Sequence, residues 1–231
     1  MTFKVKFAVI SQEDHLLKKL TISEQLMYAS KIKNKSPTNH KAVVDNILEK
    51  LNISQCANNL PDKCSGGQQK RICIAMELVS RPNVLILDEP TSGLDSVTTW
   101  QLINTLIELT KLPEPLAIVA TIHQPSARLF NLFSSVYIMS YDGQCIYQGL
   151  PQSMIGYLGQ YGLICPDFSN PSDFVLEIAS KEYGIEKVMM LSSVMRNKNE
   201  DIERFDNEIK QRVNIRFFNN LKVLTQRLEI N

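Results

Sequence analysis

The sequence has no surplus of either charge and no long apolar run. Its 231 residues carry 25 basic and 24 acidic side chains. This balance excludes a strongly basic nucleic-acid binder and a disordered acidic chain. No uninterrupted apolar run approaches the roughly 20 residues that span a bilayer, and residues 1–6 do not begin a secretory signal. We therefore expect the chain as it stands to be soluble, with one packed domain and an appendage.

Cysteine is sparse, odd in number and without a paired motif. The five cysteines are Cys56, Cys64, Cys73, Cys145 and Cys165. Because no two of them form a C-x-x-C pair, the pattern is typical of reduced cytosolic thiols. A disulfide framework and a structural zinc site are both excluded.

The order of apolar patterns predicts an α/β domain with a parallel sheet. Apolar stretches at 3–10, 84–87 and 117–122 read as strands, and the second is apolar on both faces, as a buried parallel strand must be. A helical pattern that begins at Asp95 lies between the second and third strands. Strand, helix, strand indicates a parallel crossover.

Helices are predicted between the first two strands, and a hairpin and another helix after the third. Thr21 with Glu24 forms a capping box, and a buried stripe runs along 44–51. The turn residues at 142–143 favour a hairpin between 136–139 and 145–147. The last helical stripe is Ile202, Phe205, Ile209 and Val213.

The segment from Ser65 to Gln68 is a candidate phosphate-binding helix start. Ser65, Gly66, Gly67 and Gln68 open a helical pattern. The free N–H groups and positive dipole end of a helix start can hold a phosphate, and glycines let the backbone approach closely. By itself, the same tetrapeptide also fits an ordinary tight turn.

Acidic and polar residues at strand ends are candidates for nucleotide chemistry. Asp88 and Glu89 follow the second strand, where Asp88 could hold Mg²⁺ and Glu89 could polarise water. Two solvated acids at the end of a buried strand are the alternative. His123, after the third strand, could instead be a core histidine, and Gln12, after the first strand, is uninformative alone.

Taken together and in this order, these segments resemble the ABC ATPase family. The matching elements are Gln12 as the Q-loop, Cys64–Gln68 as the signature, Val84–Glu89 as the Walker B strand, Ser92–Asp95 as the D-loop and His123 as the switch histidine. The resemblance implies a P-loop NTPase fold with a parallel sheet core and a helical subdomain. It also implies ATP and Mg²⁺ as cofactors.

The resemblance assigns roles to individual residues. The implied catalytic residues are Glu89, His123 and Gln12. The implied nucleotide-binding residues are Ser65, Gly66, Gly67, Gln68 and Asp95. The implied metal ligands are Asp88 and Gln12.

Finer motifs resemble the White-type G subfamily of half-transporters. They are residues 69–71, 89–95, 121–126 and 170–174, and the likeness covers roughly residues 5 to 180. Cys64 departs from the apolar residue, often leucine, at the first signature position. Because cysteine is small and apolar, we expect adjusted packing rather than lost phosphate contact.

The sequence contains no phosphate loop of the form G-x-x-x-x-G-K-[ST]. Its first glycine is Gly66, and no Gly-Lys pair occurs. Because the family places this loop well upstream of Gln12, we expect a truncated domain, from a fragment or an incomplete gene model. The full transporter would couple ATP hydrolysis to export, with lipids, sterols or pigment precursors as candidate substrates.

The resemblance also implies partners, and two alternatives stay open. A second nucleotide-binding domain would pair with this one as a homodimer or heterodimer. A transmembrane domain would hold it on the cytoplasmic side of a membrane, and no nucleic acid would bind. Alternatively, the chain is a non-catalytic regulatory partner that completes one ATP site, or a soluble ABC ATPase without a transport role.

The resemblance divides the chain into four parts. Residues 1–20 would end the core strand and form the Q-loop, and 21–80 would form the helical subdomain with the signature. Residues 81–180 would complete the ATPase core. Residues 181–231 would form a charged helical linker toward the transmembrane domain.

Overall fold

The computed structural model describes residues 5–34, 37–114 and 116–210, with side chains described as far as residue 197. The chain divides into two compact units, Met1–His123 and Gln124–Asn231.

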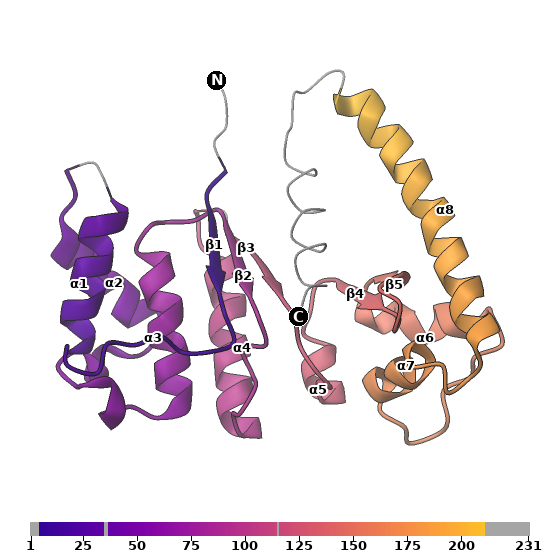
Figure 1. Ribbon diagram of the computed structural model, residues 1–231, viewed down its shortest axis with the longest axis horizontal. Coiled ribbons are helices and arrows are strands. Elements are labelled where there is room, and N and C mark those ends of the chain that lie inside the picture. Colours follow the sequence, from indigo (N-terminus) through magenta and orange to yellow (C-terminus); the bar gives the residue numbers. More distant parts are fainter. Residues whose placement is uncertain (1–4, 35–36, 115, 211–231) are drawn as a thin grey trace. The chain divides into compact units, whose positions relative to one another are not determined.

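The first unit is a parallel α/β arrangement (Figure 1). Its strands and α-helices are β1 (Phe7–Ile10), α1 (Ile22–Lys33), α2 (His40–Lys50), α3 (Gly66–Leu78), β2 (Val84–Leu87), α4 (Ser96–Thr110) and β3 (Ala117–Ala120), and two short 3₁₀-helices, Ser54–Cys56 and Pro61–Lys63, lie between α2 and α3. The strand order is β1-β2-β3, and both pairings are parallel. The predicted α/β fold class, with its parallel sheet and helices, is therefore confirmed.

The helix starts follow local capping chemistry. Thr21 accepts a hydrogen bond from the Glu24 amide, and the Glu24 carboxylate accepts one from the Thr21 amide. This confirms the capping box that the sequence predicts. Ser65 and Gln68 form the same reciprocal pair at the start of α3. Such a cap contributes about 0.5–2 kcal/mol.

One face of the sheet lies against helices of this unit. Ala8 and Ile10 of β1 and Leu85 and Leu87 of β2 are buried. Helix α3 packs against β1 and α4 packs against β3. Burial of each leucine side chain contributes about 1.5–3 kcal/mol, so this layer fixes the strands against the two helices.

The strand register aligns the three carboxyl ends. Ile10 pairs with Leu87, and Leu87 pairs with Ala120. The chain therefore leaves all three strands at the same edge of the sheet. β1 begins at Phe7, and Phe3, which the sequence places in this strand, lies outside the described residues. β3 ends at Ala120, before the predicted end at Ile122, and the Thr121 hydroxyl beyond it donates to Asp88 Oδ1.

As far as residue 210, the second unit holds a hairpin and four helices. They are α5 (Ala127–Phe130), β4 (Val136–Met139), β5 (Cys145–Gly149), α6 (Pro151–Gly159), α7 (Pro171–Ala179) and α8 (Ile185–Lys210). β4 and β5 pair antiparallel, and Gly143 in the turn has φ +76°, as the predicted hairpin turn requires. Its core includes Ile146, Met154 and Phe174.

Helix α8 begins well before the stripe that suggested it. It starts at Ile185 and includes positions 202, 205 and 209, whereas Val213 lies outside the described residues. The buried Val188, Leu191 and Met195 give its first half a packing face that the sequence analysis missed. No described helix is both long and apolar enough to cross a membrane.

Candidate functional site

The aligned strand ends bring Gln12 and Glu89 into contact. The Gln12 Nε2 group donates to Glu89 Oε2 at 3.1 Å and to Ser92 Oγ at 3.4 Å. These residues are about 80 positions apart in the chain, and the parallel register of β1 and β2 joins them. The structure thus places the predicted Q-loop glutamine on the predicted catalytic carboxylate.

Thr121 connects both acidic residues to the end of β3. Its hydroxyl donates to Asp88 Oδ1 at 2.7 Å and accepts from the Glu89 amide at 2.9 Å. Both carboxylates are partly buried. Thr121 received no role of its own from the sequence, where it stood only within the predicted strand 117–122 and the subfamily motif 121–126.

Glu89 has a strained backbone. Its φ is +41°, in the left-handed region that a residue with a side chain rarely adopts. Such a conformation costs on the order of 1–3 kcal/mol and persists where neighbours fix it. The Thr121 hydroxyl fixes the Glu89 amide, and Gln12 fixes its carboxylate. Strain of this kind gathers at functional sites, which favours a chemical role for Glu89.

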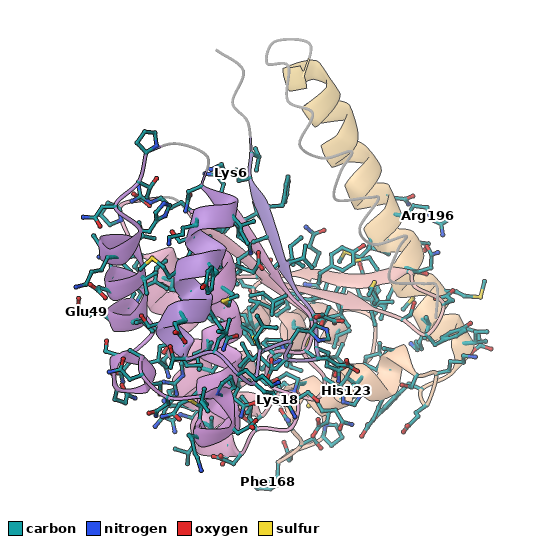
Figure 2. All side chains as sticks on the ribbon, turned by 60° about the vertical axis from the view of Figure 1, so that its left-hand side comes forward. Lys6, Lys18, Glu49, His123, Phe168 and Arg196 are labelled. Atoms are coloured by element: carbon teal, nitrogen blue, oxygen red, sulfur yellow. The ribbon has the colours of Figure 1, made fainter. Side chains whose placement is uncertain are left out.

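His123 is exposed and follows β3 (Figure 2). Its exposure contradicts the core-histidine alternative that the sequence left open. It follows Thr121 by two residues, and Thr121 binds Asp88. Its role as a switch histidine stays a prediction.

The start of α3 is open to solvent at Ser65 and Gly66. Both residues are exposed. The Ser65 side chain accepts from the Gln68 amide, and Gln68 Oε1 accepts from the Ser65 amide at 2.8 Å. Gln68 is therefore a capping residue in this structure, while Ser65 and Gly66 face outward.

The two glycines of the segment have different surroundings. A Cβ atom at Gly67 would lie 2.1 Å from Thr98 Cγ2, so Gly67 allows α3 to approach α4 closely. A Cβ atom at Gly66 would meet Leu94 Cδ2 at 3.6 Å, an ordinary contact. Packing therefore requires glycine at position 67 and leaves room at position 66.

Asp95 caps the next helix. Its carboxylate accepts from the amides of Val97 and Thr98 and from the Thr98 hydroxyl. The Thr98 hydroxyl, together with the two amides, holds the pKa of the Asp95 carboxyl below its ordinary value. The structure gives Asp95 a capping role, and its contact with nucleotide stays a prediction.

Cys64 fills a packing position at the entrance to α3. It is 7% exposed, and its thiol lies 3.8 Å from the Leu60 carbonyl oxygen. Burial raises the pKa of the Cys64 thiol to about 11, and the neighbouring Cys56 thiol adds to the effect. The side chain points into the unit, as a small apolar substitute for leucine would.

We expect Cys64 to react slowly with iodoacetamide. The thiolate is the reactive form. With a pKa of about 11 instead of 9.0, the thiolate fraction at pH 8 falls by about 100-fold. Peptide mass spectrometry after timed alkylation should give a rate at Cys64 about 100-fold below that in urea. Equal rates in the two conditions would contradict this burial.

The residues at the sheet edge fit a magnesium ion that is shared with phosphate. Mg²⁺ in nucleotide sites is bound by one or two protein oxygens plus phosphate and water. Asp88 offers carboxylate oxygens, and Gln12 offers Oε1 because its Nε2 donates to Glu89. No group of three His, Cys, Asp or Glu suited to a metal ion occurs among the described residues. A cage built from such side chains is thus not found there.

In the second unit, two side chains hold the loop that follows His123. The Ser172 hydroxyl donates to the Pro125 carbonyl at 2.6 Å, and Asn170 Nδ2 donates to the same oxygen at 3.3 Å. Gln124, one residue earlier, has φ +44°. These hydrogen bonds connect Pro125, in the subfamily motif 121–126, to the subfamily motif 170–174.

Comparison with family models gives two matches. Residues 2–92 match the ABC transporter model, and residues 123–201 match the ABC-2 type transporter model. The first match includes Gln12, the signature and Glu89. The second begins at His123.

Proteins similar to this chain include ATP-binding cassette proteins of sub-family G. The chain is 34% identical over 214 residues to rat ATP-binding cassette sub-family G member 8, covering 86% of this chain and 30% of that protein. It is 34% identical over 206 residues to human sub-family G member 5, covering 83% and 31%. It is 33% identical over 193 residues to Protein scarlet of Drosophila melanogaster, covering 80% and 28%. The chain thus spans less than a third of the length of these relatives.

Proposed function

This chain belongs to the ABC transporter family as an ATP-binding domain with G-subfamily relatives, and on that basis we propose that it serves ATP-driven membrane transport. The observation that carries the proposal is the contact between Gln12 and Glu89 at an edge that also holds Asp88. Within the same unit, the start of α3 offers an exposed helix end for a second nucleotide contact.

The start of α3 binds the phosphates of an ATP molecule that a second nucleotide-binding domain holds in its phosphate loop. Ser65 and Gly66 are exposed there, and the unpaired amides of a helix start favour anionic oxygens. The Ser65 hydroxyl accepts from the Gln68 amide, so its own proton can be donated to a phosphate oxygen. Gly66 adds no side chain between backbone and phosphate.

The sheet edge serves the hydrolytic step. Glu89 polarises the attacking water, and the Gln12 amide holds the carboxylate in place for it. Asp88 would hold Mg²⁺, which neutralises phosphate charge when bound, and the Thr121 hydroxyl fixes the orientation of Asp88. His123 contacts the γ-phosphate or the water from the end of β3. Gln68 and Asp95 contribute as the caps that shape the nucleotide contacts.

The working assembly has two nucleotide-binding domains and a transmembrane domain. The partner domain is a second copy of this chain or a related subunit. Residues 1–20, 21–80 and 81–180 contribute the Q-loop, the signature subdomain and the ATPase core, and 181–231 lead toward the membrane part. The assembly lies at a membrane with this domain on the cytoplasmic side.

A second candidate function follows from one feature of the sequence. The 231 residues contain no G-x-x-x-x-G-K-[ST] segment, which suits a regulatory partner that completes one ATP site of an intact subunit. Sequencing the transcript at both ends distinguishes the two: an upstream exon with that motif supports the transporter subunit. The match of residues 123–201 to the ABC-2 type transporter model argues against a soluble ABC ATPase.

We expect residues 1–231 alone to bind MgATP weakly and not to hydrolyse it, because no phosphate loop holds the nucleotide. Phosphate release should equal that of a Glu89→Gln variant purified in parallel. The measurement is a coupled phosphate assay over a range of MgATP concentrations. Turnover that disappears in Glu89→Gln would contradict the expectation and would mean that another segment holds the phosphates.

A further inference from the structure

Lys70 is a buried cation on the signature helix. It lies in α3, five residues after Ser65, and it is 3% exposed. A buried charge is unfavourable unless hydrogen bonds and an opposite charge compensate it. We therefore expect the Lys70 ammonium group to have specific partners inside the unit, unlike a solvated surface lysine.

Both partners of Lys70 lie in the segment that follows β1. Its Nζ group donates to the Gln12 carbonyl oxygen at 2.8 Å and pairs with Asp14 Oδ1 at 2.7 Å. Residues 11–15 of this segment are exposed. Through these two contacts, Lys70 attaches the exposed segment 11–15 to the packed helix α3.

The two ends of Gln12 have separate partners. Its main-chain carbonyl accepts from Lys70, while its side-chain amide donates to Glu89 Oε2. The Gln12 side chain has a finite length, so it can reach Glu89 only from a limited range of backbone positions. Fixing the carbonyl therefore restricts where the amide group can lie.

We propose that Lys70 is a positioning residue that holds Gln12 against Glu89. The contact links the helix that begins at the signature to the carboxylate at the end of β2. A shift of α3 would move the Gln12 carbonyl and so change the support that Glu89 receives. The inference rests on the proposed function for its meaning in hydrolysis, but the link itself is testable without nucleotide.

The test follows the side-chain amide signal of Gln12 by ¹⁵N NMR in residues 1–231 without ATP. The signal is identified by its loss in Gln12→Ala, and its shift on loss of the Glu89 contact is taken from Glu89→Ala. In Lys70→Met the signal should move in the same direction as in Glu89→Ala. Lys70→Arg keeps a donor for both acceptors, so it should restore the wild-type position.

Lys33→Met is the matched control. Lys33 on α1 also pairs with a carboxylate of α3, Glu77, and donates to the Met76 carbonyl. Its removal takes away a lysine–carboxylate pair on the same helix but no contact with Gln12. Thermal melting is measured for both variants. Both can melt at a lower temperature than the unmodified chain, but only Lys70→Met should displace the Gln12 signal.

Asp14→Asn keeps the volume of the site and weakens the hold on Lys70, so the Gln12 signal should move in the same direction by less. If Lys70→Met does not fold, this variant decides. An unmoved Gln12 signal in the folded Lys70→Met or, failing that, in Asp14→Asn overturns the proposal. Because the test uses no nucleotide, such a result does not contradict the proposed ATP function. Conversely, a failure of the chain to bind ATP would not contradict the link between Lys70 and Gln12.

Discussion

ATP turnover falls by about 10²- to 10⁴-fold when His123 is replaced by alanine in a chain that joins residues 1–231 to a phosphate-loop segment of a G-subfamily relative. The imidazole is lost from a position two residues after Thr121, which binds Asp88. Because His123 is exposed, alanine removes no buried contact and the melting temperature should stay the same. The measurement is kcat per folded molecule, with the folded fraction taken from thermal melting.

Tyr28→Ala is the control for this prediction. Tyr28 is also an exposed ring side chain, and it lies on α1, outside the segment that holds Gln12. We expect it to leave turnover within about twofold of the unmodified protein, since surface changes have small effects. A His123→Ala protein that melts earlier yet turns over ATP normally would assign His123 a structural role.

Gly66→Asp should abolish ATP-promoted association with an intact G-subfamily ATP-binding domain. The aspartate places a side chain and a negative charge where the backbone must approach phosphate. The structure leaves room for a Cβ atom at Gly66, 3.6 Å from Leu94 Cδ2. The substitution should therefore keep α3 folded, and a pull-down with and without MgATP measures the loss.

Two alanine variants separate charge from packing. Gly66→Ala adds volume at the same place without charge, so it should weaken association less than aspartate does. Gly67→Ala should act on stability instead, because its Cβ atom would lie 2.1 Å from Thr98 Cγ2. Overpacking of this kind costs about 1–3 kcal/mol. If Gly67→Ala melts like the unmodified chain, the close approach of α3 to α4 is not needed.

The fold was predictable where local chemistry decides it. The apolar run of β2 needs burial on both faces, and Ser65 with Gln68 closes a cap within four residues. The order of strands and helices then implied parallel crossovers. Gln12 and Glu89 meet because the carboxyl ends of the parallel strands β1 and β2 lie at one edge of the sheet.

Other parts of the site had no local signal. In the sequence Lys70 stood only within the subfamily motif 69–71, and its partner Asp14 lies 56 positions earlier, so only the packed structure pairs them. Thr121 could equally have faced solvent at a strand end. The early start of α8 did have a signal in the sequence, because Val188, Leu191 and Met195 repeat the i, i+3, i+7 spacing of positions 202, 205 and 209.

Light scattering of the chain mixed with an intact G-subfamily ATP-binding domain, with and without MgATP, tests the central claim most directly. The claim is that Ser65 to Gly67 complete an ATP site whose phosphate loop belongs to the partner. ATP should raise the mass of the mixture to that of a one-to-one complex for the unmodified chain and not for Gly66→Asp. Equal ATP-dependent association by both versions would contradict the claim and would leave residues 65–68 as an ordinary helix start.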